Sequence, residues 1–241
     1  MENSLYIGLS RQMTLRTAMD LVSNNIANIN TPGYRAQNPL FQEYVVDPKG
    51  QKDPLSFAYD YAQYDSTQPG TQTFTGNKFD VALDGPGFMG VQTVDGIRYT
   101  RAGNLTINNT GQLVTAAGFV VSAAGGGGAI NIPTDAREID ITDTGQIIAD
   151  GNAVGQIMVQ EFDNLQSLSP EGNGLYNSAE GGRAATETKV KQGMIEGSNV
   201  NGVVEMTRMI EILRSYQSAQ RLIQSEHDRQ KDAVSRLGRV N

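Results

Sequence analysis

The C-terminal part of the sequence, residues 201–240, constrains the fold more than any other stretch. It has the composition of one long helix, because Gly202 and Gly238 lie near its ends and neither Gly nor Pro occurs between them. Asn201 can cap this helix, and Glu205 lies in its first turn, where the helix dipole favours an acid. At ~1.5 Å per residue the helix would be roughly 55 Å long, which is more than a compact domain of this size needs.

The long helix carries an apolar seam with a seven-residue repeat. The core positions of one series are Met209, Tyr216, Ile223, Gln230 and Leu237, and those of the other are Ile212, Ala219, Glu226, Ala233 and Val240. All except the glutamine and the glutamate are apolar or aromatic, which is typical of a helix that packs against other helices. Since the helix cannot bury this seam by itself, it needs at least one partner helix.

A candidate partner helix lies at the opposite end of the chain. Ser4 can cap its start, and Thr31-Pro32-Gly33 ends it, because Pro restricts the residue before it and Gly permits a turn. Its two heptad series are Leu5, Gln12, Met19 and Ile26, and Gly8, Leu15, Val22 and Ile29. Two such helices at opposite termini predict a discontinuous coiled-coil stalk into which the middle of the chain is inserted.

The middle of the chain has the pattern of a β domain. From residue 79 to about residue 195, short apolar runs alternate with Gly, Asn and Asp turns, as in a barrel or a sandwich. Asp95-Gly96 predicts a tight hairpin turn, and residues 107–114 and 141–148 share one layout, which predicts two similar hairpins. The expected fold class is therefore α+β, with helices from both termini and an inserted all-β, barrel- or sandwich-like central domain.

Between the first helix and the β domain lies a polar segment punctuated by prolines. Within it, Phe57, Tyr59 and Tyr61 alternate with small or polar residues, which predicts an extended strand with one aromatic face. Such a face either packs against the chain's own stalk or contacts another subunit.

Composition excludes several classes of function. The net charge of −7 and the lack of a basic run argue against binding to nucleic acid or to an anionic membrane, which need clustered Lys and Arg. The sequence contains no cysteine, so disulfides and thiol chemistry are excluded. A hydrophobic content of 38% with 27 glycines indicates a turn-rich chain without a large deep core.

The N-terminal residues do not have the pattern of a secretory signal peptide. Met1-Glu2-Asn3 lacks a basic region, and Arg11 and Arg16 interrupt any apolar run. No stretch of ~18 apolar residues could cross a bilayer as a helix. If the protein leaves the cytoplasm, we expect it to use another route.

The candidate catalytic motifs are weak. His227 is the only histidine and lies on the predicted C-terminal helix, so we interpret it as solvated or interfacial rather than as catalytic or metal-binding. The glycine-rich run 125–128 lacks the Lys and Ser or Thr that follow in a phosphate-binding loop, and we interpret it as a hairpin tip.

The acidic clusters are equally unspecific. Asp140, Asp143 and Asp150 lack the spacing and the closing glutamate of a calcium loop, and we interpret them as turn residues. Glu161 and Asp163 could form the carboxylate pair of a glycosidase, but we interpret them as adjacent exposed acids. We therefore expect no enzyme activity, no metal and no cofactor.

An ordered signature lies where the N-terminal helix ends. It consists of Asn25-Ile26-Ala27-Asn28 followed by Thr31, Gly33, Tyr34 and Arg35. This order resembles the N-terminal signature of the flagellar basal-body rod and hook proteins. The resemblance runs from end to end, since residues 77–88 and 98–105 look like the opening of that family's central β domain and residues 192–201 look like the lead into its C-terminal helix.

The length of the chain is similar to that of rod proteins, because hook proteins carry additional domains and this chain has room for one. The short connector 37–76 and the ending 203–239 resemble the proximal-rod subunit more than the longer distal-rod subunit. The expected regions are residues 1–34 with 198–241 as a terminal coiled-coil domain, 35–76 as an extended connector or hairpin, and 77–197 as the central β domain.

The resemblance implies a structural role. A rod subunit assembles helically through its terminal helices into the shaft that transmits torque from motor to hook. The implied partners are other rod proteins, copies of itself, the surrounding basal-body rings, and the flagellar export apparatus during secretion, but no nucleic acid. The implied location is the periplasm-spanning rod of the basal body, reached without a cleaved signal peptide.

The resemblance and the heptad seams together place the subunit interface on the terminal helices and the signature. The expected interface residues are Leu5, Leu15, Met19, Val22, Asn25, Ile26, Asn28, Ile29, Thr31, Gly33, Tyr34, Met209, Ile212, Tyr216 and Ile223. The alternatives are a distal-rod subunit of the same family and a secreted, stalked β-domain binding protein such as an adhesin, which would form a discrete oligomer.

The first prediction concerns the substitution Ile26→Asp, which places a charge in the apolar seam. We expect it to abolish motility while the central domain stays folded, because only the helices need the seam. Swimming assays and β-type circular dichroism would measure the two effects, and normal swimming of the variant would count against a rod function.

Overall fold

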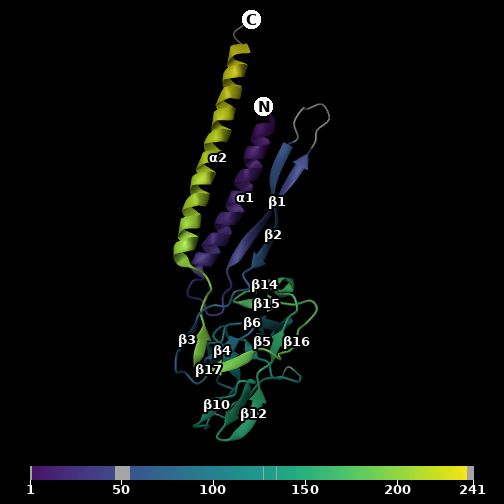
Figure 1. The fold of residues 1–241 in the computed structure, drawn as a ribbon, viewed down its shortest axis with the longest axis vertical. Coiled ribbons are helices and arrows are strands. Elements are labelled where there is room, and N and C mark those ends of the chain that lie inside the picture. The colour runs from purple at the N-terminus through teal and green to yellow at the C-terminus, as the bar shows by residue number, and fades with distance from the viewer. Residues whose placement is uncertain (1, 47–54, 127, 134, 238–241) are drawn as a thin grey trace. The chain divides into compact units, whose positions relative to one another are not determined.

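The computed structural model describes residues 2–46, 55–126, 128–133 and 135–237, and Figure 1 shows their fold. The chain forms two compact units. The helical unit comprises Met1–Ala27, Ala36–Ser66 and Asn201–Asn241, and the β unit comprises Asn28–Arg35 and Thr67–Val200. The chain therefore passes between the units four times, after residues 27, 35, 66 and 200.

Two antiparallel helices, α1 (Glu2–Ala27) and α2 (Gly202–Leu237), form the helical unit together with a β-hairpin. Asn25 bonds Glu205 near the end of α1, and Gly8 lies against Ile223 farther along the pair. The buried apolar cluster between the helices consists of Ala18, Val22 and Ile212, and the half-buried residues packed on it are Leu15, Met19, Ile26 and Met209.

α2 begins as the sequence predicts. The side-chain oxygen of Asn201 accepts hydrogen bonds from the backbone N–H groups of Val203 (3.1 Å) and Val204 (3.3 Å), and Glu205 lies in the first turn. The predicted end of the helix at Val240 lies outside the described residues. Within the part of the chain that the structure describes, no helix has an apolar stretch sufficient to cross a membrane.

α1 differs from the prediction at both ends. It begins two residues before Ser4, so Ser4 lies inside the helix and does not cap it. It ends at Ala27 because Asn28 forms a turn instead: its carbonyl and its side chain accept hydrogen bonds from the N–H (3.1 Å) and the hydroxyl (3.0 Å) of Thr31. Ile29, expected on the seam, therefore lies in this turn and is exposed.

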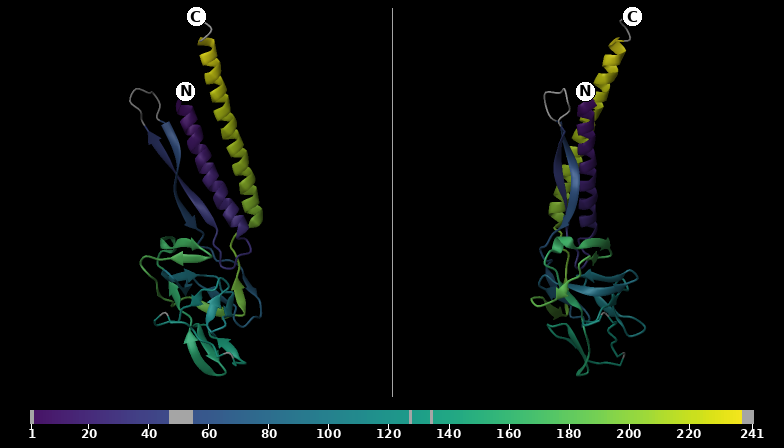
Figure 2. Two further views of the ribbon diagram at one scale, coloured as in Figure 1. Left: turned by 180° about the vertical axis from the view of Figure 1, so that it is seen from behind. Right: turned by 90° about the vertical axis from the view of Figure 1, so that its right-hand side faces the viewer.

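The hairpin of the helical unit consists of β1 (Gln37–Val46) and β2 (Leu55–Asp65), which pair antiparallel and run along α1 (Figure 2). β2 confirms the strand predicted through Phe57, Tyr59 and Tyr61. The two tyrosines are exposed and Phe57 is half-buried, so the hairpin packs on its own stalk and still presents aromatic rings to solvent.

The β unit consists of short strands and one turn of 3₁₀-helix (η1). In chain order they are β3 (Gln72–Phe74), β4 (Val81–Asp84), β5 (Phe88–Thr93), β6 (Gly96–Thr100), β7 (Leu105–Ile107), β8 (Leu113–Thr115), β9 (Val120–Val121), β10 (Ile139–Ile141), β11 (Gln146–Ala149), β12 (Asn152–Gln156), β13 (Val159–Glu161), η1 (Leu165–Ser167), β14 (Ser169–Gly172), β15 (Leu175–Asn177), β16 (Arg183–Ala184), β17 (Lys189–Gln192) and β18 (Met194–Glu196).

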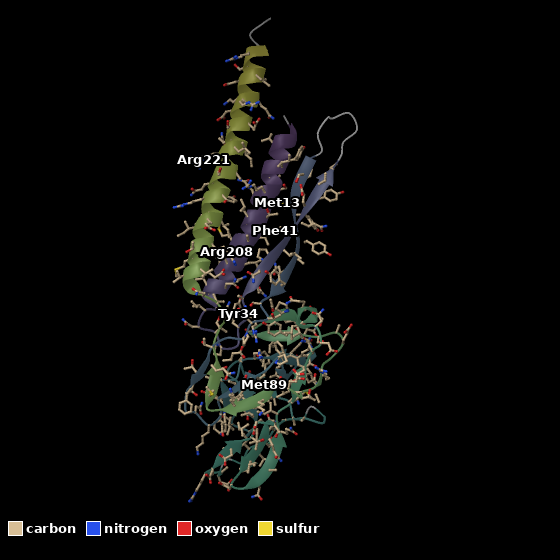
Figure 3. All side chains as sticks on the ribbon, viewed as in Figure 1. Met13, Tyr34, Phe41, Met89, Arg208 and Arg221 are labelled. Carbon is tan, nitrogen blue, oxygen red and sulfur yellow. The ribbon has the colours of Figure 1, made fainter. Side chains whose placement is uncertain are left out.

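The strands of the β unit pair antiparallel. The largest sheet has the order β14-β15-β6-β5-β9-β8-β7, and β13 pairs with both β5 and β16. A second sheet has the order β10-β11-β12, while β17 pairs with β4 and β18 pairs with β3. The larger of two buried apolar clusters contains Val81, Met89 (labelled in Figure 3), Leu113 and Ile147, which are excluded from solvent. The second cluster consists of Phe88, Tyr99, Phe162, Leu168 and Tyr176. The expected α+β class, with an all-β centre, is confirmed.

The two similar hairpins are also confirmed, as β7-β8 and β10-β11. The N–H of Gly111 donates to the carbonyl of Asn108 (3.0 Å), and the N–H of Gly145 donates to that of Thr142 (2.8 Å). Both glycines have positive φ, 80° and 78°, which other residues rarely adopt. This shared turn explains why the two segments share the order Thr-Gly-Gln.

The hairpin predicted at Asp95-Gly96 joins β5 and β6, with a shift of one residue. Thr93 pairs with Gly96, so the two turn residues are Val94 and Asp95. Gly96 is needed at the start of the next strand, where φ is 109°.

Glu161 was expected to be an exposed acid, and this expectation is wrong. Its side chain is 1% exposed, whereas that of Asp163 is 88% exposed. The Glu161 carboxylate accepts hydrogen bonds from the N–H groups of Glu187 (2.9 Å) and Thr188 (2.8 Å) and from the Thr188 hydroxyl (2.8 Å). Burial raises the pKa of Glu161, but these hydrogen bonds outweigh it and lower the pKa to about 2. The ionised carboxylate thus holds the segment before β17.

The second prediction concerns this carboxylate. Glu161→Gln should lower the free energy of unfolding of the β unit at neutral pH by about 2 kcal/mol, because the N–H groups of Glu187 and Thr188 lose a buried, ionised acceptor. In the unsubstituted protein this stabilisation is complete above pH ~4.5 and is lost as the pH falls toward 2. Thermal unfolding between pH 2 and pH 7 should show a flatter dependence in the variant. Asp163→Asn is the matched control, and equal curves for Glu161→Gln and the unsubstituted protein would contradict the prediction.

Candidate functional site

Most of the side chains expected at the subunit interface pack within the helical unit. The expected residues that meet between α1 and α2 are Leu15, Met19, Val22, Ile26, Met209 and Ile212. Those that are half-buried on the same helices are Leu5, Tyr216 and Ile223. The two terminal helices of one chain therefore cover much of each other's apolar seam.

Asn25 is the polar centre of the helical unit and is fully buried. Its amide donates to the Gln37 carbonyl (2.9 Å) and to the Glu205 carboxylate (3.3 Å), and its oxygen accepts from the Gln37 N–H (2.9 Å). Glu205 also accepts from Arg208 (labelled in Figure 3; 3.1 Å), which donates to Asn38 (3.1 Å). A side chain that donates and accepts at once thus joins the end of α1, the start of β1 and the first turn of α2.

The later part of the signature belongs to the β unit. Gly33 has φ of 69° and its N–H donates to the Glu196 carbonyl (2.9 Å). A Cβ at Gly33 would collide with the backbone of Arg101, so only glycine allows this close approach. The carbonyl of Tyr34 accepts from the N–H of Asn199 (3.3 Å).

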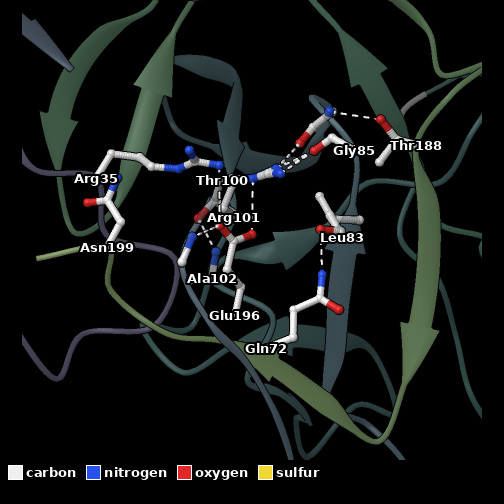
Figure 4. A network of polar contacts seen from close by, with 12 residues as sticks. Arg35, Gln72, Leu83, Gly85, Thr100, Arg101, Ala102, Thr188, Glu196 and Asn199 are labelled. Carbon is white, nitrogen blue, oxygen red and sulfur yellow. Dashed lines mark hydrogen bonds and ion pairs between the residues drawn. The ribbon is translucent and has the colours of Figure 1, made fainter. Parts of the chain in front are cut away.

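Arg35 ends the signature in a buried cluster with Glu196 and Arg101 (Figure 4). Its Nη2 lies 3.2 Å from Glu196 Oε1, and Arg101 Nε lies 3.2 Å from Glu196 Oε2 in a contact that is an ion pair by distance without hydrogen-bond geometry. The exposed fractions of the Arg35, Glu196 and Arg101 side chains are 7%, 1% and 1%. Arg35 also donates to the carbonyls of Thr67 (2.8 Å) and Gln68. We call these three charged residues the Arg-Glu-Arg cluster.

Arg101 attaches this cluster to the interior of the β unit. Its guanidinium donates to the carbonyls of Gly85 (2.8 Å) and Gly87 (3.1 Å) and lies 5.3 Å from the centre of the Phe88 ring. The pKa of Arg101 is lowered to about 10, chiefly by burial and also by the nearby Arg35, while Glu196 acts in the opposite direction. Arg101 is therefore charged at neutral pH, and two cations face one carboxylate.

A second set of apolar positions lies outside the heptad seam, and the structure leaves it exposed. On α1 they are Tyr6, Leu9 and Met13, and on α2 they are Val203, Met206, Ile210 and Leu213. Spacings of three and four residues put each set on one helix face. The same spacing is readable in the sequence, but the longer seam dominates the pattern. We call these residues the exposed stripes.

The α1 stripe borders a groove between α1 and the hairpin. The groove has a volume of about 570 Å³ and is mostly apolar. Its lining residues are Ser10, Met13, Thr14, Thr17, Tyr44, Phe57, Ala58 and Tyr59. Met13, labelled in Figure 3, belongs both to the stripe and to the groove.

The histidine and the aspartates weighed as catalytic or metal-binding candidates lie on the surface of α2, in turns or in a strand. His227 is exposed on α2. Asp143 lies in a turn and Asp150 accepts hydrogen bonds from two backbone N–H groups, whereas Asp140 lies in β10 and was wrongly expected in a turn. Across the described ranges, no group of three or more His, Asp or Glu side chains is arranged to hold a metal ion.

The third prediction concerns Asn25. Asn25→Ala should lower the free energy of unfolding of the helical unit by about 2 kcal/mol, because the half-buried Gln37 backbone groups lose their bonds to the amide and Glu205 keeps only its contact with Arg208. Urea titration followed by helical circular dichroism would measure this change. Asn30→Ala, in an exposed turn, is the control, and equal stability of both variants would contradict the role given to Asn25.

Family models match both ends and the centre of the chain. Residues 5–35 match "Flagella basal body rod protein", residues 82–149 match "Flagellar hook protein FlgE/F/G D1 domain", and residues 191–236 match "Flagellar basal body rod FlgEFG protein C-terminal". The matched ranges contain Asn25, the signature turn, Arg101 and Glu196.

Similar proteins from three bacteria span nearly the whole chain. The flagellar basal-body rod protein FlgF of Caulobacter vibrioides is 37% identical over 246 residues, with 100% of both chains covered. FlgF of Mesorhizobium japonicum is 33% identical with 99% of both covered, and FlgG of Bacillus subtilis is 33% identical with 92% of this chain and 94% of the relative covered. On these similarities the chain belongs to the flagellar basal-body rod protein family, as a structural rod subunit and not an enzyme.

Proposed function

We propose that this rod subunit assembles helically with copies of itself and with other rod proteins through the helical unit, forming part of the torque-transmitting drive shaft. The observation that supports this proposal is that apolar side chains remain exposed on α1, α2 and the hairpin after the seam between the helices has been filled. Exposed apolar surface of this extent is typical of protein contact sites.

The exposed stripes lie on different elements of the same unit, which favours an open assembly. A contact between two unlike surfaces does not close on itself, and its repetition generates a filament instead of a dimer. We propose that the α2 stripe of one copy packs into the α1 groove of a neighbouring copy. In this arrangement Met13 and Tyr59 of one subunit meet Ile210 of the next.

Most of the residues expected at the interface then act indirectly. Leu15, Met19 and Val22 build the helix pair that carries the contact surface, while the exposed stripes, which were not among the expected residues, make the contact. We further propose that the helix pair acts as a coiled-coil stalk and that the β unit is a barrel- or sandwich-like domain inserted into it.

The shares of this chain that the relatives cover support the proximal type of rod subunit. Relatives called FlgF align with 99–100% of this chain, whereas those called FlgG align with 86–92% of it. We propose a place in the periplasm-spanning part of the rod, contacts with the surrounding rings, and delivery by the flagellar export apparatus without a cleaved signal peptide. The distal-rod subunit is the alternative, because FlgG relatives also exceed 30% identity.

The fourth prediction concerns the exposed stripes. Met13→Glu and Ile210→Glu should each abolish swimming while the subunit remains folded and helical, because both side chains are exposed in the single chain and a buried charge would oppose assembly. Circular dichroism of the purified variants and the rod content of isolated basal bodies would measure the two effects.

The control is Ser218→Glu, which adds the same charge on an exposed part of α2 away from the stripe. It should swim normally. Normal rods in the Ile210→Glu strain would show that the α2 stripe is not a subunit contact.

A further inference from the structure

We propose that the Arg-Glu-Arg cluster is a clamp that fixes, on the side of the β unit, the chain segments leading to and from the helical unit. Arg35, Glu196 and Arg101 would then be positioning residues of the rod subunit. The clamp itself is a property of the β unit. Only its consequence in the cell, the transmission of load along the rod, rests on the proposed function as a drive shaft.

The cluster joins three segments that border the crossings between the units. Arg35 is the last residue of the segment 28–35, and its guanidinium binds the carbonyls of Thr67 (2.8 Å) and Gln68, which begin the segment that returns from the hairpin. Glu196 ends β18, a few residues before the chain enters α2. The Glu196 carboxylate and the Arg35 guanidinium thus connect the chain beside three of the four crossings, those after residues 35, 66 and 200.

Backbone contacts around the cluster tie the same three segments together. The Glu196 carboxylate accepts from the N–H of Gly70 (3.0 Å), and the Glu196 carbonyl accepts from the N–H of Gly33 (2.9 Å). The side chain of Asn199 donates to the Gln68 carbonyl (2.8 Å). A Cβ at Gly70 would collide with the carbonyl of residue 197, so the segments pack as closely as glycine allows.

Arg101 supplies the fixed end of the clamp. It is held by the carbonyls of Gly85 and Gly87 and by the Phe88 ring in the interior of the β unit. Figure 4 shows Arg101 and Arg35 on either side of Glu196, so the chain of contacts runs from the core through the glutamate to the segments at the crossings.

Stability alone does not account for this arrangement. A buried ion pair contributes little net stability because desolvation offsets its attraction, and a second arginine adds a like charge. A guanidinium does, however, present several donors in a rigid plane and can hold two backbone segments at once. The second arginine, Arg35, is therefore better explained as a residue that positions backbone segments than as one that stabilises the core.

The test is hydrogen exchange on the purified full chain with Arg35→Gln and Arg35→Lys. Both substitutions remove the planar guanidinium with its several donors, and Arg35→Lys keeps the positive charge. We expect exchange in residues 28–35, 67–72 and 196–200 to rise about tenfold in both variants, with no change in residues 113–121 of the core. Arg98→Gln removes the ion pair to Glu171 at the surface of the same unit and is the matched control.

Three results would overturn the clamp: unchanged exchange at the three segments, an equal rise throughout the β unit, or a loss of folding in Arg35→Gln while Arg35→Lys behaves like the unsubstituted protein. The last two would mean that Arg35 serves core stability or charge balance. Swimming in viscous medium then tests the proposed load transmission separately. Raised exchange with normal swimming would leave the clamp in place and contradict its mechanical role.

Discussion

The structure depends on the burial of one apolar seam by helices from the two ends of the chain. Val22 on α1 and Ile212 on α2 are buried against each other's helix, although almost the whole sequence separates them. Because α1 and α2 must lie side by side, the chain that forms the β unit has to leave the helical unit and return to it. The β unit is therefore an insertion, and the number of chain crossings is even.

The two units are stabilised in different ways. The β unit has a continuous apolar cluster in which Val81, Met89 and Leu113 are excluded from solvent, and it needs no neighbour for its core. The helical unit buries few apolar side chains and relies on the polar contacts of Asn25 and Glu205. A long helix whose stability comes from tertiary packing gains most from further partners, which agrees with a subunit that polymerises through this unit.

Repeated patterns and local cap and turn signals could be predicted from the sequence, and contacts between residues far apart in the chain could not. The heptad repeat predicted α2, Asn201 predicted its cap, and the repeated Thr-Gly-Gln order predicted two hairpins. The end of α1 was placed too late because the Asn28 side chain competes with the helix for hydrogen bonds. Glu161 and Glu196 were not recognised as buried because their partners lie far away in the sequence, and an isolated acid carries no signal of its burial.

The topology of the helix pair also imposes an order on folding. Asn25 and Glu205, which close the helical unit, are 180 residues apart in the sequence. On a ribosome α1 emerges first and has no α2 to pack against, whereas the β unit gains its last strand before α2 appears. Contacts of such long separation form late, since the chain must first close the loop between them. A chain truncated before α2 therefore lacks one half of the helix pair, and in the proposed assembly only whole subunits would carry the complete contact surface.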